Sequence, residues 1–264
     1  MFRTLPLAIL LGTSQVTMDS NPVMAQTMSV VQDKLDTIIV FMPTTADGIP
    51  TPVSYELEGK TRNVYFAAFS ETAVNNLVKD LKKKEEKKNS NIFAFFKKNK
   101  EQESKDSIAG NLKFQPASLT KFDSLIQPIL DNDTNARVIY VPDPSQKKYS
   151  KDLLLSQGVK RKTLNSIIDK VPVVFCPKPS LLATVKDGPR KGETFVPCST
   201  DYQTVQNIIE KSVAENPAVK KQKPKVIAIT LPQFVKMLSS GKENEVDKIR
   251  VLTTPSSLKF IKKG

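Results

Sequence analysis

Val171-Pro172-Val173-Val174-Phe175-Cys176 is the stretch of sequence that organises the rest of the chain. It is a continuous run of apolar, mostly β-branched residues, and it is too short for a stable helix, which indicates a strand buried on both faces. A similar run occurs earlier, in Thr37-Ile38-Ile39-Val40-Phe41-Met42-Pro43. The chain therefore contains two related buried strands, and the segments that follow each of them can be compared.

Those segments repeat in the same order after both strands. Each strand is followed by a turn, two extended pieces, a helix opened by Ser, Thr or Asp, a further strand, a second helix and a last strand. This argues for an internal duplication with a period of about 110 to 130 residues, much longer than the period of solenoid repeats. We therefore expect two pseudo-equivalent halves, each with the order β-β-β-α-β-α-β. The matched segments are 53–57 with 180–185, 64–69 with 194–198, 70–78 with 199–209, 113–125 with 225–237, and 137–142 with 249–255.

The second helix of each half carries apolar residues at helical spacing, which predicts that they face the core. The residues expected in the core are Leu119, Phe122, Leu125, Leu231, Phe234 and Met237.

The composition is that of a folded, soluble protein of mixed helices and strands. Of 264 residues, 39% are hydrophobic and 25% are charged, which excludes a disordered chain. The formal net charge is +13, which favours an anionic partner. However, the excess is mostly Lys spread along the chain, and no nucleic-acid-binding motif is present, so we expect no nucleic-acid partner.

The N-terminal residues 1–25 resemble a secretory signal with cleavage after Ala25, because a positive tip precedes a short apolar run. A plastid-type targeting segment and a mature N-terminal helix are the alternatives. The expected organisation is a targeting segment at 1–25, a first pseudo-repeat at 33–145 with an insert at 82–110, a connecting helix at 146–170 and a second pseudo-repeat at 171–264.

The insert at 82–110 has no counterpart in the second half. It is rich in Lys and contains a small apolar cluster formed by Ile92, Phe93, Phe95 and Phe96. One interpretation is a solvated loop whose aromatic residues pack back onto the body. The other is a client-binding or membrane-surface contact with basic flanks.

Residues that are missing restrict the chemistry. The chain has no His and only nine Gly, and no glycine-rich loop leads from a strand into a helix. These facts exclude His-dependent hydrolases, the usual His-based metal sites and the common phosphate-binding and dinucleotide-binding motifs. We therefore expect neither an enzyme nor a bound cofactor or metal.

The two cysteines, Cys176 and Cys198, each lie at the end of a predicted strand in the second half. If those strands run parallel side by side, the two thiols lie at the same edge and a structural disulfide can form. Buried free thiols are the other structural interpretation. A thiol-dependent redox protein is the functional alternative, although the Cys-x-x-Cys spacing is absent.

The order of these motifs resembles the Tic22 family, which is the soluble intermembrane-space component of the chloroplast protein-import machinery and its cyanobacterial homologues. The resemblance covers roughly residue 33 to the C-terminus and depends on the whole duplicated layout. The residues that carry it are 38–41, Val64-Tyr65-Phe66, Ala117-Ser118-Leu119, 171–175 and Val251-Leu252-Thr253-Thr254-Pro255-Ser256-Ser257-Leu258.

The resemblance implies an α/β or α+β domain of two pseudo-twofold-related halves, with a sheet flanked by helices and apolar surface grooves. It further implies a chaperone-like translocation factor that binds precursor proteins between two membranes, with components of the outer- and inner-membrane translocon as partners and a peripheral membrane contact. The expected compartment is a cyanobacterial periplasm or thylakoid lumen, or alternatively a plastid intermembrane space.

Overall fold

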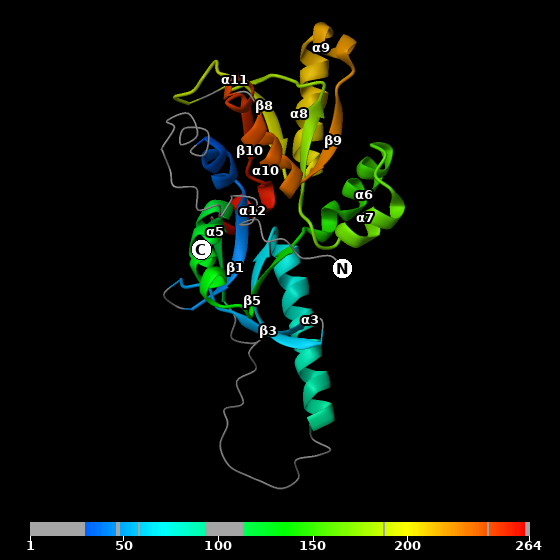
Figure 1. The fold of residues 1–264 in the computed structure, drawn as a ribbon. Coiled ribbons are helices and arrows are strands. Elements are labelled where there is room, and N and C mark those ends of the chain that lie inside the picture. Colours follow the sequence, from blue (N-terminus) through cyan, green and yellow to red (C-terminus); the bar gives the residue numbers. More distant parts are fainter. Residues whose placement is uncertain are drawn as a thin grey trace.

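The computed structural model describes residues 30–45, 48–57, 59–92, 113–186, 188–241 and 243–261. In this part of the chain each half forms a five-stranded sheet (Figure 1). The first sheet contains β1 (Ile39–Thr44), β2 (Val53–Leu57), β3 (Lys60–Ala68), β4 (Lys113–Ser118) and β5 (Ala136–Val141). The second contains β6 (Val173–Lys178), β7 (Ala183–Thr184), β8 (Thr194–Ser199), β9 (Lys225–Thr230) and β10 (Ile249–Leu252).

The two sheets have the same connectivity, which confirms the duplication predicted from the sequence. In the first sheet β1 pairs antiparallel with β3 and β4, and β5 pairs parallel with β3. In the second, β6 pairs antiparallel with β8 and β9, and β10 pairs parallel with β8. The registers also agree, because Phe41 lies opposite Ala68 and Pro116, while Phe175 lies opposite Ser199 and Ala228.

Helices follow the strands in equivalent places. The first half has α3 (Glu71–Ile92) and α5 (Leu119–Asn132), and the second has α8 (Tyr202–Glu215), α9 (Pro217–Gln222), α10 (Leu231–Ser240), α11 (Glu243–Val246) and α12 (Pro255–Ile261). Between the halves, the connector contains η1 (Pro144–Gln146), α6 (Lys147–Ser156) and α7 (Arg161–Ile167). The single helix expected at 146–170 is thus two helices, separated by a turn in which Gly158 has a φ of +88°.

The sheet registers pair the first helices of the two halves differently from the sequence comparison, and the difference is two residues. Ser70, not its aligned partner Ser199, is the counterpart of Asp201, because Ala68 and Ser199 occupy the same place in their sheets. Both caps are made accordingly: Ser70 Oγ accepts from Ala73 N at 3.0 Å, and Asp201 accepts from Thr204 N at 2.9 Å. These bonds satisfy otherwise free N–H groups at each helix start.

A single hydrophobic cluster joins the two halves. The inner faces of both sheets contribute to it, together with α5, α10 and the helical residues 30–36. Phe122 of α5 and Phe234 of α10, which are equivalent, are both fully buried in it. Leu119 and Leu231 are buried as predicted and Met237 is partly buried, but Leu125 is 37% exposed. Ile126 faces the core in place of Leu125, since it lies one full turn after Phe122.

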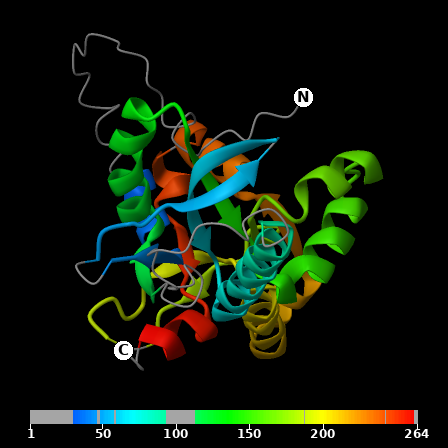
Figure 2. The same cartoon turned by 90° about the horizontal axis from the view of Figure 1, so that it is seen from below.

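The outer faces of the sheets carry separate clusters. On the first sheet, Phe41, Val64 and Phe66 pack beneath α3. On the second, Phe175 and Val226 pack with residues of α6, α7 and α8. Figure 2 shows α3 beside the connector and the C-terminal α12, with which α3 also makes contacts.

Candidate functional site

A cavity of about 210 Å³ lies where the two halves meet the connector. Its walls come from the C-terminal ends of β3 and β5, from η1 and α6, from the residues between α7 and β6, and from the loop between β8 and α8. The lining residues are Phe69, Val141, Pro142, Asp143, Pro144, Gln146, Lys147, Ser150, Ile168, Asp169, Val171, Pro172, Val173 and Thr200.

The lining divides into an apolar wall and a polar rim. Phe69 and Ile168 are buried, and Pro142 and Pro172 add rigid apolar surface. On the rim, Lys147 Nζ lies 2.6 Å from a carboxylate oxygen of Asp169, and both side chains are more than half exposed. Such an exposed ion pair contributes little to stability, so it can open without a large cost in free energy.

Gln146 fixes the connector side of the cavity. Its side-chain oxygen accepts a hydrogen bond from the backbone N of Tyr202 at 2.9 Å, and its amide nitrogen donates to Asp201 at 2.8 Å. Gln146 therefore caps α8 from a different segment, and it holds the connector against the start of that helix. Asp143 supports the same segment, because its side chain accepts from Ser145 N at 2.9 Å.

An aromatic stack continues from this contact. The rings of Tyr149 in α6 and Tyr202 in α8 are nearly parallel, with centroids 4.3 Å apart, and Phe175 meets Tyr202 edge to face. Tyr149 remains partly exposed. Connector and second half are therefore joined by both polar and aromatic contacts beside the cavity.

The size of the cavity limits what it can receive. Sites for small-molecule ligands and cofactors usually enclose about 300–1,000 Å³, and this cavity of about 210 Å³ is smaller. An apolar wall with a polar rim suits one large side chain of a polypeptide, in the way that anchor residues fill pockets at protein interfaces.

Asp123 is a titratable group away from the cavity. It lies on α5 and accepts a hydrogen bond from the Tyr140 hydroxyl at 3.0 Å. Burial raises the pKa of Asp123 to about 7, against the lowering effect of that hydrogen bond. The pair lies beside Phe69 and Phe122, whose rings both meet Tyr140 edge to face.

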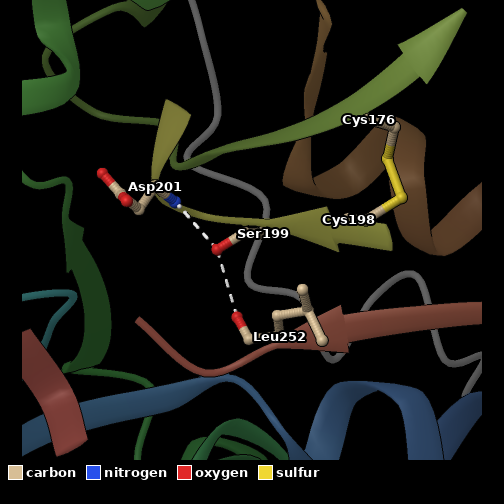
Figure 3. The surroundings of a disulfide bond; sticks show 5 residues. All are labelled: Cys176, Cys198, Ser199, Asp201 and Leu252. Atoms are coloured by element: carbon tan, nitrogen blue, oxygen red, sulfur yellow. Dashed lines mark hydrogen bonds between the residues drawn. A yellow bond between two sulfur atoms is a disulfide. The ribbon is translucent and has the colours of Figure 1, made fainter. Parts of the chain in front are cut away.

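Cys176 and Cys198 are joined by a disulfide in the structure (Figure 3). The two cysteines pair although their strands do not run parallel: β6 and β8 are antiparallel, and the cysteines lie directly opposite each other. Both are buried, at 5% and 1% exposure, on the inner face of the sheet. Figure 3 also shows Ser199, which donates to Leu252 O at 3.1 Å and accepts from Asp201 N at 3.2 Å.

The predicted apolar cluster of the insert falls largely beyond the described residues. Ile92 is the last residue of α3, whereas Phe93, Phe95 and Phe96 lie outside the described part, as does the predicted cleavage site after Ala25. Residues 82–92, expected to begin a loop, instead continue α3. Their Lys and Glu residues are good helix formers, which explains the difference.

Within the described residues, no group of three or more Cys, Asp or Glu side chains is placed to hold a metal ion. No helix among these described residues is both long and apolar enough to span a membrane.

Sequence reasoning missed the cavity and Gln146, which holds the connector against the start of α8. The cavity lies between segments far apart in the sequence, and no periodic pattern marks them. The only local indication is the spacing of Pro142, Pro144 and Pro172 at the ends of the predicted strands.

No protein-family model and no curated protein sequence matches the chain. Two similar solved structures are both of Tic22. The Anabaena protein, described as a protein-transport component, has a TM-score of 0.63 and 14% identity over 89% of this chain and 96% of its own. Tic22 from Plasmodium falciparum has a TM-score of 0.57 and 16% identity over 88% of this chain and 96% of its own. The resemblance inferred from the sequence is thus confirmed at the level of the fold.

Proposed function

We propose that this chain is a protein-translocation factor of the Tic22 type, which holds extended or partly folded client polypeptides without catalysis. The observation that carries the proposal is the Tic22-like fold over 89% of the chain. The junction cavity adds a specific contact, since its dimensions suit one client side chain.

The disulfide supports a compartment outside the reducing cytosol. Buried structural disulfides persist in oxidising environments such as a bacterial periplasm, and Cys176 and Cys198 are deeply buried. We propose export to a cyanobacterial periplasm or thylakoid lumen, with the plastid intermembrane space as the alternative, and contact there with translocon components of the two membranes. The same burial opposes the thiol-dependent redox role, because redox-active thiols are usually accessible.

An aggregation assay tests the holding role. Thermally unfolding citrate synthase, followed by light scattering, should aggregate more slowly when the purified chain is present. Thr200→Phe, which fills the cavity from its rim, should weaken this effect several-fold. Gln203→Phe provides the matched control, because Gln203 is exposed on α8 and does not line the cavity. Equal scattering with and without the wild-type chain would refute the proposed function.

The compartment is tested separately, by N-terminal sequencing of the protein recovered from fractionated cells. A mature form that starts at Gln26 in the periplasmic or lumenal fraction would support export. An intact N-terminus in the cytosolic fraction would remove the compartment on which the proposal depends.

A further inference from the structure

The outer edge of the second sheet is covered by the end of α6, and one side chain of the connector bonds to its backbone. β9 is the last strand in the order β10-β8-β6-β9, so one side of its backbone faces away from the sheet. Gln157 lies in the turn after α6, and its amide nitrogen donates to Ala228 O at 2.9 Å. Its side-chain oxygen accepts from Ala228 N at 2.8 Å.

The Gln157 amide therefore presents to Ala228 one donor and one acceptor. A residue of a neighbouring antiparallel strand presents the same pair of groups, because it exchanges both of its hydrogen bonds with one partner residue. Gln157 occupies this place with a side chain, where an added strand would place its backbone.

The first sheet closes the equivalent edge in a different way. Pro116 of β4 lies opposite Phe41, as Ala228 of β9 lies opposite Phe175, so Pro116 and Ala228 are counterparts. Proline has no N–H group, so Pro116 cannot donate the backbone hydrogen bond that an added strand would need at this position. One edge is thus blocked permanently, whereas the other is blocked by a side chain that can move.

We propose that β9 is a strand-addition site for an extended client segment, which replaces Gln157 on Ala228. This proposal rests on the proposed function and specifies how the client is bound. The occupant is an extended polypeptide backbone, since the pairing groups that Gln157 supplies are those of a peptide unit. Strand addition of this kind gives affinity through main-chain hydrogen bonds and tolerates many sequences, which suits a factor that handles varied clients.

The replacement requires that the turn and the end of α6 move away from β9, because α6 packs against this strand. Gln157 follows the end of α6 at Ser156 and precedes Gly158, whose φ of +88° marks a tight turn. The turn is bonded to α6, since Val159 N donates to Leu154 O at 3.0 Å. Gln157 and the end of α6 therefore regulate access to the edge together.

The test measures binding of a fluorescein-labelled peptide of alternating valine and glutamate, about ten residues long, by fluorescence anisotropy. Gln157→Ala should lower the dissociation constant at least tenfold relative to the wild-type chain, because the competing side chain is gone. Ser156→Ala is the matched control, since the Ser156 hydroxyl donates to Leu153 O within α6. This control should bind as the wild type does.

Two further measurements identify the mode of binding. Ala228→Pro, which copies the natural Pro116, should abolish the gained affinity when combined with Gln157→Ala. If that variant does not fold, a probe peptide N-methylated at alternate residues replaces it, because the peptide then lacks the backbone donors that strand pairing needs. This probe should not bind to Gln157→Ala.

The outcomes separate this inference from the proposed function. If Gln157→Ala is folded but binds the peptide no more tightly than the wild type, or binds the N-methylated peptide equally well, strand addition at β9 is wrong. A variant that dimerises without binding peptide would also overturn it, since the edge then takes a second copy of the chain. If the peptide binds as expected but client aggregation is not slowed, the edge site stands and the translocation role fails.

Discussion

Asp123 is a carboxyl at a position where the second half has an apolar core residue. The sheet registers make Asp123 equivalent to Val235, which is almost fully buried. A carboxyl therefore occupies a place where the other half has an aliphatic side chain, and burial raises its pKa to about 7.

This shift predicts a loss of stability as the pH rises. The unfolded state ionises Asp123 near its ordinary value of 3.8, whereas the folded state keeps the proton up to about 7. Between these values the folded state binds more protons, so the free energy of unfolding falls as the pH increases and the loss is complete above about 7. Asp123→Asn should remove this loss, and should be more stable than the wild type at pH 8 by about 2 kcal/mol, half of the full linkage value because the side chain is partly exposed.

Urea denaturation at pH 5 and pH 8 measures this difference. The exposed Asp152→Asn is the control and should shift neither curve. An Asp123→Asn variant that is less stable than the wild type at pH 8 would show that the carboxylate is stabilising and that the raised pKa is wrong.

The disulfide also has a counterpart that suggests its own test. By the sheet registers Cys176 is equivalent to Met42 and Cys198 to Ala67, which meet on the inner face of the first sheet. The double variant Cys176→Met/Cys198→Ala copies that pair and keeps the site apolar. Since the cross-link spans 22 residues, its removal should lower the free energy of unfolding by about 3 kcal/mol.

Denaturation curves with and without dithiothreitol check this value. The reductant should destabilise the wild type by a similar amount and leave the double variant unchanged. If dithiothreitol leaves unfolding of the wild type unchanged even when thiol titration shows full reduction, the cross-link does not contribute to stability.

At the scale of elements, the connector is held by side chains that cap backbone groups of the second half. Gln146 satisfies the first N–H of α8 and also bonds to its cap residue Asp201. Gln146→Glu should destabilise the protein by about 1–2 kcal/mol, because a carboxylate cannot donate to Asp201 and two like charges are brought together. Guanidinium denaturation measures the loss, with Gln203→Glu on the exposed face of α8 as the control. Equal stability of Gln146→Glu and the wild type would show that this bond does not hold the connector.

The order of strands and helices could be predicted from the sequence, whereas their exact registers could not. Apolar runs and capping residues mark each element locally, so both copies of the β-β-β-α-β-α-β order were visible. The two-residue shift between Ser70 and Asp201 depends on hydrogen bonds between strands, which leave no local pattern. Leu125 was wrongly placed in the core because spacings of three and four residues after Phe122 are both helical, and only packing selects Ile126.

At the scale of the whole molecule, the sequence showed two similar halves but not that they share a core. Lys34 donates to Asp247 O at 3.0 Å, and Thr253 donates to Thr37 O at 3.1 Å, so the start of the first half is bonded to the end of the second. The cavity arises from the same docking, since Val141 and Pro172 meet only when both halves are in place. The periodicity of apolar residues does not predict contacts between residues so far apart in the sequence. For this reason the candidate site is visible only in the structure.

A shared core predicts that the two halves unfold together. Phe122 of α5 and Phe234 of α10 lie in one cluster, which also contains the buried residues of both inner sheet faces. Phe122→Ala and Phe234→Ala should each lower the stability of the whole protein by about 3–5 kcal/mol, and calorimetry should show a single transition that moves to lower temperature in both variants. Hydrogen exchange supplies the local test, because amides of β3 and of β8 should lose protection equally in either variant. Two resolved transitions, or loss of protection confined to the mutated half, would show that the halves are independent domains and that the cavity between them opens without unfolding.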